Sequence, residues 1–253
     1  MTAAARRTAL VTGAASGLGA LAAQRLAAAD WDVVAVDLDE DGLARTSLRS
    51  PNTHTRTCDV ADFKAVEGVV TEAGTVHRVV HAAATGPLVR ALDQSLDEVE
   101  RVLRINFLGT VNVVRATLPG MLERGRGELV LFSSPASWVP VAKSSAYAAS
   151  KAAINAYAET LSREHARSGV RFRVVCPRQV DTPGFRAAAA ADPAATGRMK
   201  GMPPGAVLDA VDRSLARDGG LYVFPDPLTR ATVLAQRLVP RLMDRVLGRV
   251  TAG

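Results

Sequence analysis

The chain has 253 residues, of which 48% are hydrophobic and 22% are charged, a composition typical of globular proteins. This balance excludes a disordered chain, a collagen-like chain and a coiled coil, and no apolar run reaches the roughly 18 residues that a membrane span requires. The formal net charge is +6, but the arginines are scattered without interleaved aromatic residues, so we expect a solvated basic surface and no nucleic-acid site. The N-terminus lacks the apolar core of a secretory signal, so the expected location is cytoplasmic.

Short runs rich in β-branched residues alternate with longer amphipathic stretches. In chain order the expected strands are Thr8–Val11, Asp32–Asp37, His54–Cys58, Arg78–Ala82, Glu128–Ser133, Arg171–Cys176 and Leu221–Phe224, and the expected helices lie near 17–29, 62–73, 95–122, 145–168 and 206–217. Several strands are apolar almost throughout, which a parallel sheet covered on both faces requires. The alternation predicts an α/β fold, a doubly wound parallel sheet of about seven strands with helices on both faces. We expect one domain, residues 1–253.

Two segments depart from this alternation. Residues 183–205 are rich in Ala, Gly and Pro and follow a strand end, where ligands bind in open α/β sheets. We expect them to form a substrate-side loop, with a plain surface connection as the alternative. Residues 228–253 combine arginines with leucines at helical spacing and predict a basic amphipathic helix interrupted at Pro240. Packing on its own subunit or on a partner subunit is favoured over peripheral contact with an anionic membrane.

The two cysteines, Cys58 and Cys176, are far apart in the chain, and neither has the spacing of a metal site. We expect two free, buried thiols and no metal centre.

A glycine-rich segment follows the first strand and opens the first helix. Its sequence is TGAASGLG, from Thr12 to Gly19. Glycine allows positive φ and a close approach of backbone N–H groups to a pyrophosphate, and the helix N-terminus adds partial positive charge. This position between a strand and a helix favours dinucleotide binding over a turn without a ligand. The expected cofactor contacts here are Gly13, Ser16, Gly17, Leu18 and Gly19.

Acidic residues follow the second and third strands. Asp37 lies 18 residues after Gly19, where a carboxylate can accept hydrogen bonds from the adenosine ribose and repel a 2′-phosphate. The alternative is that Asp39 is the ligand, or that neither is. Asp59 is a candidate for the adenine amino group, or else an N-cap of the helix that begins near Asp62.

A second group of residues points to proton transfer. Tyr147 and Lys151 are four apart on one predicted helix and therefore share a face. An ammonium group beside a phenol stabilises the phenolate, so we expect a lowered pKa for Tyr147 and a role as acid or base. Ser134, thirteen residues upstream at a strand end, can hydrogen-bond a substrate oxygen, and Ser133 and Ser137 compete for that role.

These motifs resemble the short-chain dehydrogenase/reductase family, over roughly residues 6–224. The family's T-G-x-x-x-G-x-G matches the segment Thr12–Gly19, its Y-x-x-x-K matches Tyr147 and Lys151, and the spacing of thirteen maps its catalytic serine to Ser134. Its catalytic asparagine maps to Asn106. The resemblance implies a Rossmann-like fold, a nicotinamide cofactor and a homotetramer or homodimer.

The resemblance also implies a role for each matched residue. Tyr147 would exchange the proton, and Lys151 would also bind the nicotinamide ribose. Ser134 would orient the substrate oxygen, and Asn106 would hold a water in a proton relay. Further cofactor contacts are implied at Val60, Ala83, Pro177, Val180 and Thr182.

Two segments depart from the family pattern. The usual N-N-A-G after strand four is His81-Ala82-Ala83-Ala84 here, where His81 can replace some of the asparagine's hydrogen bonds. The usual P-G after strand six is Pro177-Arg178, and Arg178 either binds an anionic or carbonyl-bearing substrate or, as favoured, points to solvent. Both departures put the strength of cofactor binding in doubt.

The expected function is an NAD-dependent oxidoreductase that interconverts a secondary alcohol and a ketone on a hydrophobic small molecule. NADP is the less favoured cofactor. Two alternatives stay open, namely a non-catalytic sensor or scaffold that binds the cofactor, and an NADPH-dependent ketoreductase of secondary metabolism.

Overall fold

The structure is a computed structural model that describes residues 6–48, 50–192, 201–217, 219–241 and 243. Its strands are β1 (Thr8–Thr12), β2 (Asp32–Asp37), β3 (Thr53–Thr57), β4 (Val76–His81), β5 (Gly127–Phe132), β6 (Val170–Val175) and β7 (Tyr222–Val223). Its helices are α1 (Gly17–Ala28), α2 (Glu40–Ser47), α3 (Phe63–Ala73), α4 (Leu96–Leu103), α5 (Gly109–Glu123), α6 (Ser145–Glu164), α7 (Pro183–Ala191), α9 (Pro204–Leu215) and α10 (Pro227–Leu238). A π-helical segment, η1 (Arg104–Leu108), joins α4 to α5, and a short 3-10 turn, η2 (Pro135–Ser137), follows β5.

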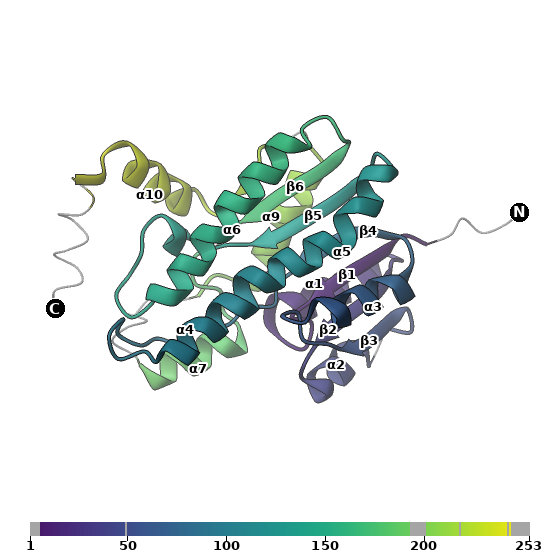
Figure 1. The fold of residues 1–253 in the computed structure, drawn as a ribbon, viewed down its shortest axis with the longest axis horizontal. Coiled ribbons are helices and arrows are strands. Elements are labelled where there is room, and N and C mark those ends of the chain that lie inside the picture. The colour runs from purple at the N-terminus through teal and green to yellow at the C-terminus, as the bar shows by residue number, and fades with distance from the viewer. Residues whose placement is uncertain (1–5, 49, 193–200, 218, 242, 244–253) are drawn as a thin grey trace, which may run out of the picture.

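The seven strands form one sheet in the order β3-β2-β1-β4-β5-β6-β7, and every neighbouring pair is parallel. This confirms the predicted α/β fold with a doubly wound parallel sheet (Figure 1). The strand order reverses between β1 and β4, so the connections after these two strands leave toward opposite faces of the sheet. In open α/β sheets such a reversal leaves a crevice at the carboxyl ends of the strands, where ligands bind.

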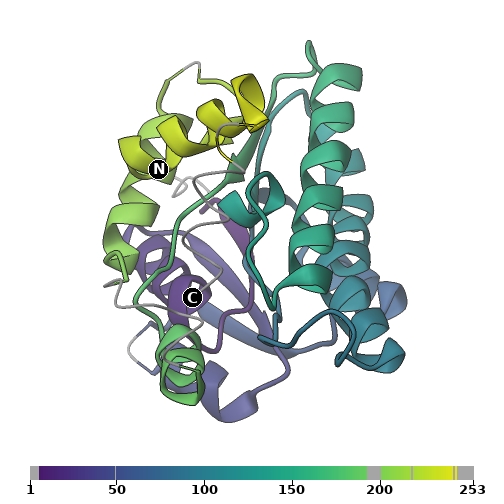
Figure 2. The same cartoon turned by 90° about the vertical axis from the view of Figure 1, so that its left-hand side faces the viewer.

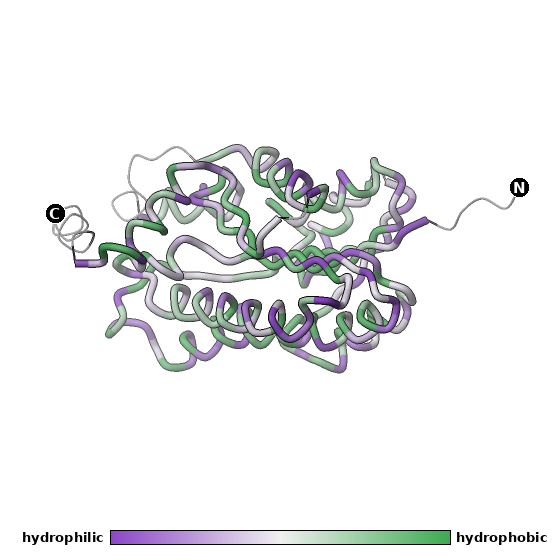
Figure 3. The backbone as a smooth tube through the Cα atoms, turned by 90° about the horizontal axis from the view of Figure 1, so that it is seen from above, coloured by the Kyte–Doolittle hydropathy of each residue, from purple (hydrophilic) through white to green (hydrophobic). Residues whose placement is uncertain are grey.

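Helices cover both faces of the sheet (Figure 3), and alternate residues of β1 belong to different sides of the core. On β1, Ala9 and Val11 pack with α1 and α9, whereas Leu10 packs with α3, α5 and α6. Both faces are therefore buried, which explains why the strands read as almost continuous apolar runs. Cys58 and Cys176 are free and buried in this core, as predicted.

Two short helices, α2 and α7, were not predicted from the sequence. The polar helix α2 has no apolar stripe to reveal it, but the Asp39 carboxylate caps it by accepting from the Gly42 backbone N–H. Helix α7 occupies part of 183–205, so the prediction of a continuous loop there is wrong for these residues. Thr182 caps α7 and Pro183 sits in its first turn, a position that suits proline because no helical N–H is lost. Residues 193–200 lie outside the described part.

Two expected helices differ from the prediction in shape. The stretch 95–122 is broken by the π-helical segment η1, and the C-terminal helix α10 ends at Leu238, just before Pro240, as the proline predicts. The part of the predicted 228–253 helix that follows residue 243, with Arg245 and Arg249, lies outside the described residues.

A buried carboxylate ties three strands together near their amino ends. Glu128 of β5 accepts from Arg78 Nε of β4 at 2.5 Å and from an Arg171 Nη of β6 at 2.5 Å, and the sheet register pairs all three residues. The Arg78 guanidinium also lies over the Trp31 ring and reaches Asp212 at 3.3 Å. A buried carboxylate is stable only when paired in this way.

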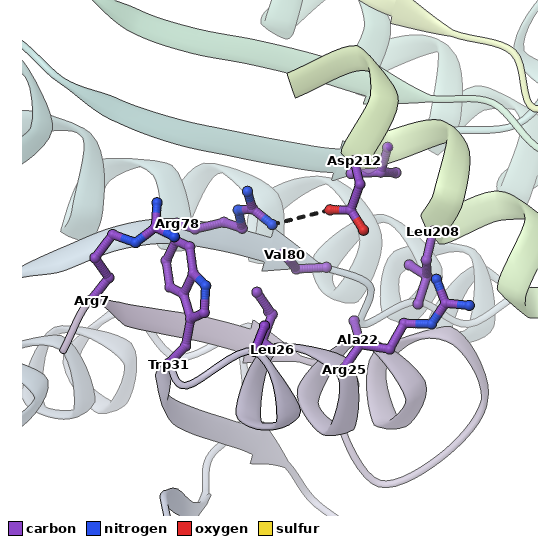
Figure 4. A pocket seen from close by; sticks show the side chains of 11 residues that line it. Arg7, Ala22, Arg25, Leu26, Trp31, Arg78, Val80, Leu208 and Asp212 are labelled. Atoms are coloured by element: carbon purple, nitrogen blue, oxygen red, sulfur yellow. Dashed lines mark hydrogen bonds and ion pairs between the residues drawn. The ribbon is translucent and has the colours of Figure 1, made fainter. Parts of the chain in front are cut away.

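A hollow of about 260 Å³ adjoins this network between α1 and α9 (Figure 4). Arg7, Trp31 and Arg78 line it, and all three lie near the amino ends of strands. The hollow is therefore at the opposite end of the sheet from the crevice described above, and its arginines already contact Trp31 and the neighbouring carboxylates.

We predict that Glu128→Gln lowers the free energy of unfolding by about 3 kcal/mol, because it leaves the largely buried Arg78 guanidinium, 14% exposed, without its main counter-charge. Urea unfolding monitored by circular dichroism measures the change. The matched control is Glu72→Gln, which breaks the exposed pair between Glu72 and Arg56 and should change stability by less than about 1 kcal/mol. Equal effects of the two substitutions would contradict a structural role for the buried pair.

Candidate active site

The carboxyl ends of β1 and β4 are neighbours, with Thr12 paired to His81 in the register. Figure 2 is viewed from this end of the molecule. The glycine turn follows β1, and the loops after β2, β4, β5 and β6 leave from the same edge. The parallel sheet thus collects the predicted cofactor and catalytic residues at one edge.

The glycine turn adopts a conformation that side chains would prevent. Gly13 has φ of 69°, and a Cβ there would lie 2.7 Å from the Ala83 backbone nitrogen. Gly17 has φ of 56°, and a Cβ there would meet the Thr182 methyl group at 3.2 Å. The turn is therefore packed directly against two other predicted cofactor residues, Ala83 and Thr182, which come from distant parts of the chain.

The start of α1 has the properties of a phosphate-binding helix end. Ser16 occupies the N-cap position but its side chain makes no capping bond, and the first turn carries no acidic residue. Gly19 lets the helix begin tightly against the turn, since a Cβ there would overlap the Gly13 carbonyl. Backbone N–H groups and the helix dipole at this end remain suited to an anion, so the turn fits a dinucleotide pyrophosphate.

Asp37 lies against this turn. Its carboxylate accepts from the backbone N–H groups of Ala15 at 3.0 Å and Leu38 at 2.7 Å. Asp39, the alternative ligand, is instead occupied as the N-cap of α2 and as an ion-pair partner of Arg45. Of the two acidic residues, Asp37 is therefore the one held against the glycine turn.

The two acidic residues that follow β3, Asp59 and Asp62, have different structural roles. Asp62, and not Asp59, caps α3, because its Oδ1 accepts from the backbone N–H groups of Lys64 and Ala65. Asp59 closes a local turn by accepting from Ala61. Val60 is buried, and its carbonyl accepts from the Asn112 side chain at 2.9 Å.

The Ser134 side chain, at the end of β5, lies close enough to Tyr147 on α6 to lower its pKa. The Ser134 hydroxyl also accepts from the Ala136 backbone N–H at 3.2 Å. The two competing serines have other partners. Ser133 donates to the Lys151 carbonyl, and Ser137 donates to the Ser134 carbonyl. Of the three candidates, Ser134 is therefore the one that the fold pairs with the tyrosine.

Lys151 is buried one helical turn beyond Tyr147. Its Nζ donates to the Phe132 carbonyl at 2.8 Å and lies 5.6 Å from the centre of the Tyr147 ring. Burial lowers the pKa of Lys151 from 10.5 to about 8, so the ammonium group is close to losing its proton in mildly alkaline solution.

The expectation of a lowered pKa for Tyr147 is not met in this structure. Burial raises the pKa of Tyr147, and the hydrogen bond with Ser134 acts in the opposite direction but is the weaker effect. The reason is that removing the phenolate from water outweighs local stabilisation. The phenolate of Tyr147 is therefore disfavoured by its burial, and the nearest positive charge is the Lys151 ammonium group, 5.6 Å from the centre of the ring.

Asn106 sits in the π-helical segment η1, and its side chain clamps a neighbouring loop. Its Nδ2 donates to the Thr85 carbonyl and to Ser150 Oγ, while its Oδ1 accepts from the Thr85 N–H. The Ser150 hydroxyl in turn donates to the Tyr147 carbonyl. π-helical segments frequently mark functional sites. Here the segment directs Asn106 toward the loop that follows β4.

The hydrogen bonds of Asn106 bring two further residues to the site, Thr85 and Gly86, which were not predicted from the sequence. Thr85 is held by Asn106 on both sides, and the next residue, Gly86, lies against the Tyr147 ring. A Cβ at Gly86 would be 2.5 Å from Tyr147 Cδ2, so only glycine fits without displacing the ring. No sequence signal separates Gly86 from other loop glycines, because the contact joins residues 61 positions apart.

The two departures from the usual pattern are accommodated by local contacts. His81 is buried, its Nδ1 lies 2.7 Å from Thr12 Oγ1, and burial together with the Lys151 charge lowers its pKa to about 3, so it is neutral. Arg178 does not simply point to solvent, because its Nε lies 3.9 Å from the Asp226 carboxylate.

The connection after β6 reaches both the glycine turn and the segment just before α9. It contains Pro177, Val180 and Thr182. Val180 is buried and forms a bridge with Met202, through bonds from Met202 N–H to the Gln179 carbonyl and from Asp181 N–H to the Met202 carbonyl. Thr182 thereby stays against Gly17, as its predicted role requires.

Loops on either side of the Ser134–Tyr147 pair are tied together. Lys143, in the loop before α6, forms an ion pair with Asp192 at the end of α7. The Lys143 carbonyl also accepts from the Val89 N–H, in the loop after β4. These contacts join three loops around the rim of the candidate site.

Comparisons with known proteins agree with this geometry. The model of the short chain dehydrogenase family matches residues 7–192. The chain is 38% identical over 188 residues to 1-deoxy-11-beta-hydroxypentalenate dehydrogenase of Streptomyces exfoliatus, covering 70% of this chain and 68% of the relative. It is 35% identical over 182 residues to 2-dehydro-3-deoxy-L-rhamnonate dehydrogenase (NAD(+)) of Sphingomonas sp., covering 70% and 73%. A solved oxidoreductase of the short chain dehydrogenase/reductase family from Burkholderia thailandensis superposes with a TM-score of 0.80 at 28% identity, covering 93% of this chain and 98% of that one.

The lowered pKa of Lys151 predicts a pH-dependent stability. Between pH 8 and about 10 the unfolded chain holds a proton on Lys151 that the folded chain has lost, so the free energy of unfolding should rise with pH. Relative to Lys151→Met, the native protein should gain about 1.4 kcal/mol per pH unit in this window and show a constant difference below it. Urea titrations of the cofactor-free protein measure this, with Lys64→Met on the surface of α3 as the control. Parallel pH profiles for native protein and Lys151→Met would contradict the burial of a charged ammonium group.

Proposed function

The chain belongs to the short-chain dehydrogenase/reductase family, and from this premise we propose that it is an NAD-dependent enzyme that interconverts a secondary alcohol and a ketone on a hydrophobic small molecule. Membership makes it an oxidoreductase with a nicotinamide cofactor. The proposal concerns the finer points, which are the preference for NAD, the class of substrate and the residues that carry the reaction.

One observation carries the proposal. A hydroxyl, a phenol and a buried ammonium group, from Ser134, Tyr147 and Lys151, are adjacent at the sheet edge where the glycine turn and Asp37 also lie. This combination can bind an alcohol or carbonyl oxygen, exchange a proton with it and stabilise the resulting charge.

Each residue of the site has a separate role in this proposed reaction. A bound nicotinamide cofactor supplies the hydride chemistry, accepting hydride from a carbinol carbon or donating it to a carbonyl. Ser134 Oγ holds the substrate oxygen, and Tyr147 Oη takes the hydroxyl proton in oxidation or returns it in reduction. Because burial disfavours the phenolate, the Lys151 charge is needed to stabilise it. Asn106 holds the Thr85–Gly86 segment against the Tyr147 ring, and this contact fixes where the proton is exchanged.

Asp37 supports the preference for NAD. Its carboxylate is held beside the glycine turn by backbone N–H groups, where it can accept from ribose hydroxyls and would repel a 2′-phosphate. The Sphingomonas relative, at 35% identity, carries NAD(+) in its name, which supports the same preference.

The substrate class rests on the loop that leads from Ser134 to Tyr147. This loop carries Val139, Pro140 and Val141, which favour an apolar substrate body. Trp138, in the same loop, packs on Tyr222 of β7, with the two ring centroids 4.9 Å apart. This contact holds the loop against β7. Both named relatives are dehydrogenases, which supports oxidation of an alcohol as the assay direction. By the same family resemblance, we propose a homodimer or homotetramer.

We predict that Tyr147→Phe lowers turnover at least about 100-fold, because it removes the proton carrier, while NADH affinity changes little. Turnover is measured as NADH formation from NAD with a panel of hydrophobic secondary alcohols, and affinity by nicotinamide fluorescence. Tyr157→Phe is the matched control, since Tyr157 lies on the same helix and packs its ring against Phe107. Near-native turnover in Tyr147→Phe, with Tyr157→Phe unchanged, would exclude Tyr147 as the acid or base.

A further inference from the structure

Helix α10 is fixed at its start to the edge of the sheet that carries the candidate site. The Asp226 carboxylate caps it by accepting from the Thr229 N–H at 2.9 Å and from the Thr229 hydroxyl at 2.7 Å, and it also pairs with Arg178. Thr229 and Val233 are buried, so one face of the helix packs on the body of the protein. Figures 1 and 2 show α10 (yellow) at the same end of the molecule as α7.

The opposite face of α10 is apolar and exposed. Leu228, Leu234 and Leu238 are 70%, 46% and 78% exposed, and with Ala231 they recur at helical spacing along one stripe. Val239, directly after the helix, is 46% exposed. Single exposed leucines are ordinary on a protein surface, but a continuous apolar stripe marks an interaction site.

Arginines border this stripe. Arg230 and Arg237 are exposed and lie along one side of it, and Arg241 is exposed just beyond the end of the helix. None of the three forms an ion pair with a carboxylate in the described residues. The sequence from Pro227 to Met243 contains these three arginines and no acidic residue. An outward apolar face with a basic border is the pattern of a helix that lies in the interface of an anionic bilayer.

We propose that the exposed stripe of α10 is a peripheral binding surface for anionic lipid membranes. Leu228, Leu234 and Leu238 would enter the boundary between headgroups and acyl chains, and the arginines would meet the lipid phosphates. Symmetric pairing of α10 with the same helix of a second copy fits less well, because it would bring the arginines of the two helices together without counter-charges. The helix spans 12 residues, and no helix in the described part is long and apolar enough to cross a bilayer, so the contact is at the surface.

The position of α10 has a consequence for substrate supply. Because the helix lies at the carboxyl end of the sheet, a membrane-bound molecule would hold this end toward the lipid. A hydrophobic alcohol or ketone dissolved in the bilayer would then reach the site from the nearest side. This consequence rests on the proposed function, whereas the membrane contact itself does not and is tested without any substrate.

The test is co-sedimentation of the purified full-length protein with vesicles of phosphatidylglycerol and phosphatidylcholine, compared with phosphatidylcholine alone. We expect binding to the anionic vesicles that weakens as salt is raised. Leu234→Gln combined with Leu238→Gln should reduce the partition coefficient about tenfold or more, since two leucines lose their burial in the interface. Arg230→Gln combined with Arg237→Gln should cause a similar loss on anionic vesicles.

The matched control combines Leu48→Gln with Leu92→Gln, two leucines that are 80% and 99% exposed on other elements. All variants should unfold at the native temperature, because every substituted side chain is exposed. Absence of vesicle binding by the native protein, or binding that the leucine variant leaves unchanged, overturns the proposal. Equal binding to neutral vesicles at all salt concentrations also overturns it. If vesicles are not bound but the leucine variant has a smaller mass by light scattering, a second copy covers the stripe.

Discussion

The parallel direction of all seven strands is the constraint on which the candidate site depends. Each strand must deliver its carboxyl end to the same edge, and the reversal of strand order between β1 and β4 separates the connections there. As a result Gly13 lies against Ala83, and Thr182 lies against Gly17, although these residues are far apart in the chain. The same edge receives Asp37 from β2 and Ser134 from β5. A single antiparallel strand among them would move its residues to the opposite end.

Burial then determines the chemistry of the residues collected at this edge. Tyr147 and Lys151 are both removed from water, which raises the pKa of the phenol and lowers that of the ammonium group. In both cases burial shifts the equilibrium toward the neutral form, but with a pKa of about 8 Lys151 still holds its proton at neutral pH. The polar groups around them are satisfied by the Phe132 carbonyl and by the Asn106 clamp on Thr85. These bonds hold the reacting groups in one geometry, whereas the buried His81 Nε2 beside them has no hydrogen-bond partner among the described residues.

The sequence was sufficient for the fold and for the grouping of the main site residues. Alternating apolar strands and amphipathic helices predicted the sheet, and the motif spacing placed Ser134, Tyr147 and Lys151 together. The sequence did not predict contacts that depend on packing between distant parts of the chain. The contact of Gly86 with the Tyr147 ring, the Asn106 clamp and the ion pair of Arg178 with Asp226 depend on side chains meeting across the fold. The direction of the Tyr147 pKa shift also depends on burial, which residue spacing does not reveal.

Cofactor preference tests the central claim most directly, because it joins the glycine turn, Asp37 and the proposed activity. Purified protein is titrated with NADH and with NADPH while nicotinamide fluorescence is followed. We predict that NADH binds at least about tenfold more tightly than NADPH. Asp37→Asn should reduce this ratio of affinities, because it weakens the repulsion of the 2′-phosphate, and Asp39→Asn should leave the ratio unchanged. Tighter binding of NADPH would contradict the role of Asp37. Binding of neither would show that the changes at His81–Ala84 and Pro177–Arg178 have disabled the site.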